Sequence, residues 1–253
     1  MLFEARARAS LAAYLTFFHS ARGLAMISFD PSGKGIERVA FEWGRSMVRH
    51  AGVEVEVHGL RPEHFDAPFV VMANHASHFD IPILLSVLPR CPGFLAKKEL
   101  FDFPVFGPAM RGIHCVPIDR VDRRQSLEAI DAAAGLVRAG GRLVVFPEGT
   151  RGDGRSLQAL KKGPFHLVQR ARVPIVPVGL SGTAAICPRD IFKVYPGKVI
   201  VRFGEPIMFP EERPVNLASE RHAVMETVAA ELSRLSGMPR EAPRRRASVP
   251  PAS

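Results

Sequence analysis

The chain has 253 residues and a hydrophobic content of 47%, which is enough to build a sizeable core, so we expect one large domain with short appendages. Its 34 Lys and Arg against 25 Asp and Glu give a net charge of +9, which suits nucleic acid, an anionic membrane surface or a phosphorylated substrate without choosing among them. The three cysteines, Cys91, Cys115 and Cys187, are widely separated, which argues against a disulfide framework or a structural zinc site and favours a reducing, cytoplasmic compartment.

The N-terminal part, residues 1–50, reads as a helical hairpin with turn chemistry at 30–33. Leu11, Leu15 and Phe18 recur at helical spacing between arginine-containing ends. An amphipathic helix on a membrane surface and a helix packed on the core both fit this pattern. No apolar run approaches the roughly 18 residues that a membrane-spanning helix needs, so we do not expect a transmembrane segment.

Strands and helices alternate from residue 51 to 237. Residues 69–72 and 143–146 are continuous apolar runs, typical of strands that are buried on both faces. The other strand candidates are 53–57, 94–96, 113–118, 175–178 and 199–203, and the clearest helices are 123–138, 162–170 and 220–235. This alternation predicts an α/β domain with a mixed, mostly parallel sheet flanked by helices. The remaining tail, 238–253, is basic and rich in Pro and Ala, and we expect it to be disordered.

A polar segment at 73–80 lies between two apolar runs, where a buried strand gives way to a helix. His75 and Asp80 are five positions apart, so they do not share a helix face and meet only if a bend precedes a helix that begins near Asp80. A carboxylate behind an imidazole fixes its tautomer and makes the other ring nitrogen a better general base. The alternative for this segment alone is that Asp80 caps the helix and His75 is an ordinary loop histidine.

Two further polar clusters also follow predicted strands: Asp119-Arg120, and Glu148-Gly149-Thr150-Arg151. Because the carboxyl ends of parallel strands meet at one edge of a sheet, we expect the three clusters to converge. The two arginines suit a phosphate or a carboxylate, and Gly149 lets the backbone approach a ligand. Taken alone, Arg120 reads as a surface arginine and 146–151 as a turn. No nucleophilic side chain stands out, so a base here would activate the hydroxyl of an acceptor.

These residues resemble the glycerolipid acyltransferases that are related to bacterial 1-acylglycerol-3-phosphate acyltransferase. Four sequence blocks occur in the order that this family has. They are N-H-x-S-x-x-D at 74–80, a second block from Lys97 to Arg120, F-P-E-G-T-R at 146–151, and V-P-I-V-P-V at 173–178. The match covers roughly the central two thirds of the chain and leaves out the N-terminal helices and the tail.

The resemblance implies transfer of a fatty acyl group from acyl-CoA or acyl-carrier protein to the free hydroxyl of lysophosphatidic acid, which gives phosphatidic acid. It implies that His75 is the base, that Asp80 orients it, that Arg120 and Arg151 bind the acceptor's phosphate, and that Glu148, Gly149 and Thr150 shape the acceptor site. It requires no metal and no resident cofactor. We therefore expect a peripheral enzyme on the cytoplasmic face of the membrane, with a lysophospholipid and no nucleic acid as partner.

Two other functions stay open at this stage. The acceptor can be another lysolipid, such as a lyso-ornithine lipid, because the four blocks determine the chemistry more than the head group. A non-catalytic basic module that binds membranes or nucleic acid is the second alternative, although simple electrostatic binding requires none of the blocks. The phenylalanine-rich segment 101–106 has three interpretations, which are membrane docking, core packing and an acyl-chain tunnel.

Overall fold

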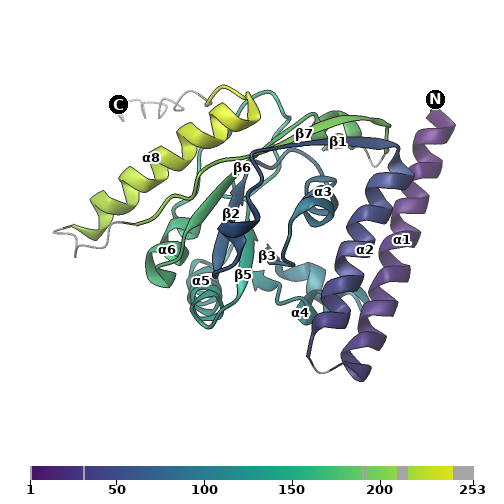
Figure 1. Cartoon of the computed structure of the whole chain (residues 1–253), viewed down its shortest axis with the longest axis horizontal. Coiled ribbons are helices and arrows are strands. Elements are labelled where there is room, and N and C mark those ends of the chain that lie inside the picture. Colours follow the sequence, from purple (N-terminus) through teal and green to yellow (C-terminus); the bar gives the residue numbers. More distant parts are fainter. Residues whose placement is uncertain (1, 31, 190, 192, 210–215, 242–253) are drawn as a thin grey trace, which may run out of the picture.

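The computed structural model describes residues 2–30, 32–189, 191, 193–209 and 216–241. Two long helices, α1 (Leu2–Phe29) and α2 (Lys34–Ala51), lie side by side at one end of the molecule (Figure 1). In the turn between them the Asp30 carboxylate accepts hydrogen bonds from the backbone N–H groups of Ser32 and Gly35, at 3.0 and 2.6 Å. The predicted N-terminal two-helix segment is confirmed. Within the described residues, the structure contains no helix that is both long enough and apolar enough to cross a membrane.

A seven-stranded sheet forms the centre of the domain, with the strand order β1-β7-β6-β2-β5-β3-β4. The strands are β1 (Val53–His58), β2 (Phe69–Ala73), β3 (Gly93–Lys97), β4 (Val116–Ile118), β5 (Arg142–Val145), β6 (Ile175–Ser181) and β7 (Gly197–Phe203). Neighbouring strands are parallel except for β6 and β7, which are antiparallel. The predicted mixed, mostly parallel sheet is therefore confirmed.

Helices cover both faces of the sheet. They are α3 (Asp80–Val87), α4 (Phe106–Gly112), α5 (Arg123–Arg138), α6 (Lys162–Ala171), α7 (Thr183–Ile186) and α8 (Leu217–Ser236), with short 3-10 turns η1 (Pro62–Phe65) and η2 (Lys98–Asp102). Figure 1 shows α1 to α4 on one side of the central strands and α5, α6 and α8 on the other. Strand β2 serves both layers, because Phe69 and Val71 join the core cluster under α1 to α3 while Val70 and Met72 join the one under α5, α6 and α8. This explains its continuous apolar sequence.

The strand predicted at 113–118 is shorter in the structure and begins only at Val116. Helix α4 continues to Gly112, and the chain then turns through His114, whose φ of 60° lies in the left-handed region. The turn packs closely on β3, since a Cβ on Gly93 would lie 2.2 Å from the carbonyl oxygen of His114. Residues 113–115 thus reverse the chain rather than extend the sheet.

The chain after α8 remains attached to the domain as far as Glu241, in contrast to the sequence-based boundary at 238. Leu157 pairs with this segment on both sides: its N–H donates to the carbonyl of Pro239 at 2.9 Å, and its carbonyl accepts from the N–H of Glu241 at 2.9 Å. Met238 is buried, and Arg240 forms an ion pair with Glu226 at 2.7 Å. The rest of the predicted tail, 242–253, lies outside the described residues.

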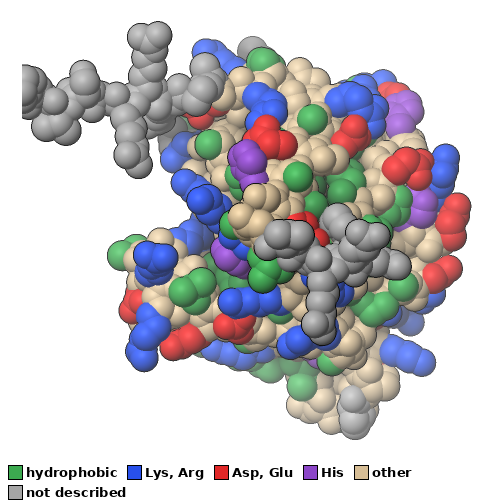
Figure 2. Space-filling view, turned by 90° about the vertical axis from the view of Figure 1, so that its left-hand side faces the viewer, with side chains coloured by type: hydrophobic (Ala, Val, Ile, Leu, Met, Phe, Trp, Pro, Cys, Tyr) green, Lys and Arg blue, Asp and Glu red, His purple; other side chains and the backbone are tan. Residues whose placement is uncertain are grey.

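The positive charge is mixed with acidic groups on the face that carries α8. Figure 2 shows Lys and Arg side chains spread over this face with Asp and Glu side chains among them. Arg170 of α6 pairs with Asp131 of α5, and Arg234 of α8 pairs with Glu231 of the same helix at 2.6 Å. Surface pairs of this kind contribute about 0–1 kcal/mol each to stability, so their main effect is to break up the basic surface.

Candidate active site

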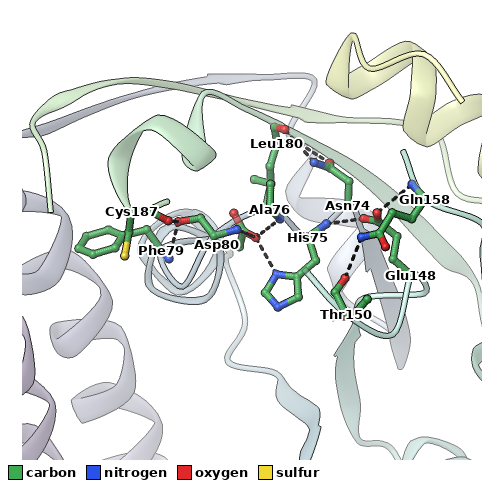
Figure 3. A network of polar contacts seen from close by, with 11 residues as sticks. Asn74, His75, Ala76, Phe79, Asp80, Glu148, Thr150, Gln158, Leu180 and Cys187 are labelled. Atoms are coloured by element: carbon green, nitrogen blue, oxygen red, sulfur yellow. Dashed lines mark hydrogen bonds and ion pairs between the residues drawn. The ribbon is translucent and has the colours of Figure 1, made fainter. Parts of the chain in front are cut away.

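The loop between β2 and α3 brings His75 and Asp80 together (Figure 3). Strand β2 ends at Ala73 and α3 begins at Asp80, so a bend separates the two residues. The Nδ1 atom of His75 lies 2.7 Å from Oδ2 of Asp80, whose side chain is fully buried. The same oxygen accepts the N–H groups of Ala76 and Ser77 at 2.8 and 2.9 Å. Because the carboxylate only accepts, Nδ1 carries the proton and Nε2 keeps the lone pair that a general base needs.

The loop is also held by two residues that we did not identify from the sequence. The side chain of Asn74 forms two hydrogen bonds to the backbone of Leu180, at 2.9 and 2.7 Å, and so joins the end of β2 to β6. The hydroxyl of Ser77 donates to the carbonyl of Cys187 at 3.0 Å and accepts the N–H of Phe79 at 3.1 Å. Both belong to the N-H-x-S-x-x-D block, so that block is the feature of the sequence that could have identified them.

Glu148, which follows β5, connects its own loop to the loop of His75. The side chain is 2% exposed, and its carboxylate accepts the N–H of His75 at 2.6 Å and the N–H of Gln158 at 3.0 Å. Desolvation by burial raises the pKa of Glu148 to about 7, because it outweighs the stabilising effect of the two N–H groups on the charged form. In the structure the carboxylate of Glu148 therefore accepts hydrogen bonds from two backbone N–H groups of the site.

The rest of the 146–152 loop wraps around His75. The ring of Phe146 stacks on the imidazole, with ring centroids 3.9 Å apart and an angle of 14° between the ring planes. The N–H of Gly152 donates to the carbonyl of His75 at 2.7 Å. Gly149 has a φ of 73°, which favours glycine, and it closes the turn through a 3.0 Å bond to the carbonyl of Phe146. The carbonyl of Thr150 accepts a 3.4 Å hydrogen bond from the side chain of Gln158.

Two arginines lie at this edge of the sheet. Arg151 is half-buried, and its Nη1 atom is buried without a hydrogen-bond partner among the described residues. Arg120 follows β4, and the pKa of its exposed side chain is lowered first by partial desolvation and then by the positive charge of Arg151. Two neighbouring guanidinium groups repel each other unless an anion lies between them, so this pair can bind a phosphate or a carboxylate.

Asp119 shapes the turn that carries Arg120. Its Oδ1 accepts the N–H groups of Val121 and Asp122 at 2.8 and 2.9 Å, and its other oxygen pairs with Lys98. The Lys98 hydrogen bond, followed by the two backbone N–H groups, lowers the pKa of Asp119 to about 2. The aspartate is therefore charged at neutral pH, and its hydrogen bonds hold the turn that carries Arg120.

An apolar cavity lies on the other side of α3. Its volume is about 710 Å³ with its open mouth included, and its walls come from α1 to α4 and β3. The wall includes Ile81 and Leu85 of α3, the helix that begins at Asp80. The phenylalanines of segment 101–106 have three different surroundings: Phe101 is buried, Phe103 is exposed, and Phe106 lines the cavity.

The described residues contain no group of three or more His, Cys, Asp or Glu side chains that could hold a metal ion. What the site offers instead is an oriented imidazole with a free Nε2, a pair of guanidinium groups and an adjacent apolar cavity. These groups can deprotonate a hydroxyl, bind an anion and accommodate a hydrocarbon chain.

Residues 54–181 match the family model described as Acyltransferase. The chain is 32% identical over 205 residues to the 1-acyl-sn-glycerol-3-phosphate acyltransferase alpha of Mus musculus, a match that covers 75% of this chain and 70% of the relative. It is 39% identical over 123 residues to the chloroplastic 1-acyl-sn-glycerol-3-phosphate acyltransferase of Brassica napus, which covers 49% of this chain. The chain spans only 36% of that protein, and 56% of a similar one from Cocos nucifera.

The fold is similar to that of a solved structure. The crystal structure of the 1-acyl-sn-glycerophosphate acyltransferase of Thermotoga maritima aligns with a TM-score of 0.73 at 24% sequence identity. The alignment covers 94% of this chain and 100% of the other. At this level of identity the likeness concerns the arrangement of helices and strands.

Proposed function

The chain belongs to the acyltransferase family, among the 1-acyl-sn-glycerol-3-phosphate acyltransferases, and on this premise we propose that it acylates the free hydroxyl of lysophosphatidic acid to form phosphatidic acid. The donor is a thioester, acyl-CoA or acyl-carrier protein. The observation that carries the proposal is the pairing of His75 with a buried Asp80 beside two guanidinium groups. The family supports the reaction type, and the geometry supports the role of each residue.

The reaction begins with proton transfer to Nε2 of His75. As the acceptor's hydroxyl loses its proton, its oxygen attacks the carbonyl carbon of the thioester. A C–O bond forms and the C–S bond breaks, and the leaving thiolate takes the proton back from the imidazolium. Asp80 stabilises the imidazolium between these two steps, because its carboxylate lies 2.7 Å from Nδ1 and is shielded from water.

Arg151 and Arg120 bind the phosphate of the acceptor in this proposal. The unpartnered, buried Nη1 of Arg151 supports the assignment, since a buried guanidinium donor without an acceptor is costly until an anion arrives. Arg120 completes a two-sided clamp. A planar guanidinium matches the geometry of phosphate oxygens, which fixes the acceptor's hydroxyl relative to His75.

One acyl chain occupies the apolar cavity in this proposal, and α3, which begins at Asp80, forms part of its wall. Its walls are almost entirely apolar, with Trp43, Leu85 and Phe106 among them, as expected for a hydrocarbon-binding site. Helices α1 and α2 form part of the wall. A chain that leaves a lipid bilayer would therefore enter the protein next to the N-terminal helices.

Helix α1 is the proposed contact with the membrane. Its most exposed aromatic side chains are Phe3, Tyr14, Phe17 and Phe29, which are 60 to 84% exposed, and arginines lie on the same helix. Exposed aromatic and basic side chains on one helix favour binding to an anionic membrane surface. We propose that the enzyme binds peripherally, on the cytoplasmic face.

A direct assay tests the reaction. Purified protein is mixed with acyl-CoA and lysophosphatidic acid in detergent micelles, and thiol release and lipid product are followed, with His75→Ala as the control. We expect phosphatidic acid from the wild type and none from the variant. Thiol release without phosphatidic acid would contradict the proposed acceptor and point to another lysolipid, such as a lyso-ornithine lipid. Full activity of His75→Ala would contradict the proposed base.

The phosphate clamp is tested with Arg151→Met and Arg120→Met. Each substitution removes a positive charge but keeps an apolar stem of similar length. We expect a higher KM for lysophosphatidic acid with little change in the KM for acyl-CoA. An unchanged KM for lysophosphatidic acid in both variants would exclude a phosphate-binding role for these arginines.

A further inference from the structure

We propose that Glu148 is a positioning residue for His75, which holds the backbone of the catalytic loop and makes no contact with the acceptor. The inference rests on the proposed function, in which His75 is the base. It assigns Glu148 a role different from the one that its sequence block implies, namely shaping the acceptor site. The two roles predict opposite kinetic effects, so they can be distinguished.

Both oxygens of the Glu148 carboxylate are already occupied. Oε1 accepts the N–H of His75 at 2.6 Å, and Oε2 accepts the N–H of Gln158 at 3.0 Å. The residue is 2% exposed, so a substrate can reach the carboxylate only by displacing the loop. A buried carboxylate that satisfies two backbone donors is a structural acceptor, because losing it would leave both donors unpaired.

The loop that contains Glu148 forms hydrogen bonds to both backbone polar groups of His75. Its N–H goes to Glu148, and its carbonyl accepts the N–H of Gly152 at 2.7 Å. The imidazole stacks on Phe146 of the same loop and is bonded to Asp80 through Nδ1. The positions of the backbone and the ring are thus both set, and the free Nε2 points to one place only.

Gln158 completes this arrangement from outside the four sequence blocks. Its N–H donates to Glu148, and its side-chain amide donates to the carbonyl of Thr150 at 3.4 Å, which closes the loop on itself (Figure 3). There is little spare room, since a Cβ on Gly152 would lie 3.1 Å from the amide nitrogen of Gln158. Any loss of the carboxylate therefore displaces the segment that supports the imidazole.

Substitution of Glu148 should lower kcat and leave both KM values near those of the wild type. Misplacing a reacting group by about 1 Å costs about 100-fold in rate, which is the effect expected for Glu148→Ala. In Glu148→Gln the amide oxygen still accepts one N–H while the NH2 group faces the other, so we expect a smaller loss, of about tenfold. An acceptor-binding role predicts instead a raised KM for lysophosphatidic acid with kcat retained.

The experiment measures kcat and both KM values for the wild type, Glu148→Gln and Glu148→Ala, with Arg151→Met as the matched acceptor-binding control and thermal melting to confirm folding. A fall in kcat alone, partly rescued by Gln, is the expected result. A rise in the acceptor's KM like that of Arg151→Met, or wild-type kinetics in Glu148→Ala, would overturn the inference. A wild type that forms no phosphatidic acid would defeat the proposed function itself, and with it this inference.

A second measurement uses the unsubstituted protein and does not depend on how the variants fold. The His75 amide is hydrogen-bonded to a buried carboxylate, so its hydrogen exchange should be slow, whereas the amides of an untethered catalytic loop exchange quickly. Fast exchange of the His75 amide in the folded wild type would show that Glu148 does not hold the loop.

Discussion

Replacing Asp80 by Asn isolates the charge that stabilises the catalytic imidazolium. Oδ2 of Asp80 accepts three hydrogen bonds, from Nδ1 of His75 and from the N–H groups of Ala76 and Ser77. Oδ1 is buried and has no partner among the described residues. An Asn side chain with its oxygen at the Oδ2 position keeps all three bonds and removes the charge. Asp80→Ala, in contrast, leaves three donors unpaired at about 1–3 kcal/mol each.

The expected size of the effect follows from the distance and the burial. With N and O 2.7 Å apart, the charge centres of the two groups are about 4 Å apart, and at an effective dielectric constant of about 20 their attraction is about 4 kcal/mol. Losing it when the imidazolium forms corresponds to a decrease in kcat of about 1000-fold. The buried amide nitrogen lacks an acceptor, so stability should fall by no more than about 3 kcal/mol.

The assay is steady-state formation of phosphatidic acid by the full chain, with kcat and KM determined separately and folding checked by thermal melting. Asp80→Asn should have a strongly reduced kcat and an unchanged KM for lysophosphatidic acid. A folded variant that keeps the wild-type kcat would refute the reasoning, since the buried charge would then have no part in the reaction. A change confined to KM would equally contradict it.

Three further predictions concern stability and the C-terminal segment. Gly44→Ala places a Cβ 2.8 Å from a backbone oxygen of α3 and should destabilise the fold by about 1–3 kcal/mol in urea unfolding, whereas Gly135→Ala, with open space around it, should be neutral or stabilising. Burial raises the pKa of Glu148 from 4.5 to about 7, so the protonated side chain stabilises the fold below pH 4.5 and this stabilisation is lost as the pH rises to 7. Relative to Glu148→Gln, the free energy of unfolding of the wild type should fall by about 3 kcal/mol over this range. Urea unfolding at each pH measures it. Deleting residues 242–253 should leave kcat unchanged. Deleting 239–253 removes the backbone hydrogen bonds to Leu157, next to the Gln158 amide, and should lower kcat about tenfold. Equal activity of the two truncated proteins would contradict this prediction.

Local patterns in the sequence determined the elements and much of their arrangement. The unbroken apolar runs at 69–72 and 143–146 predicted strands that are buried on both faces, and both lie in the centre of the sheet. The five-residue spacing of His75 and Asp80 required a bend, which the structure has between β2 and α3. These predictions succeed because side-chain periodicity and helix geometry are properties of neighbouring residues, so a single sequence records them.

Only the tertiary structure decided which distant groups meet. The N–H of His75 pairs with a carboxylate 73 positions away, and Asn74 pairs with backbone 106 positions away. The antiparallel pairing of β6 with β7, the short β4 and the attachment of 239–241 to Leu157 also depend on approach in space. The family resemblance implies an acceptor-site role for Glu148, and nothing near Glu148 in the chain indicates that its carboxylate accepts two backbone N–H groups. Such donors become partners only when folding brings them within hydrogen-bonding distance and excludes water, and neither condition is written in the residues next to Glu148.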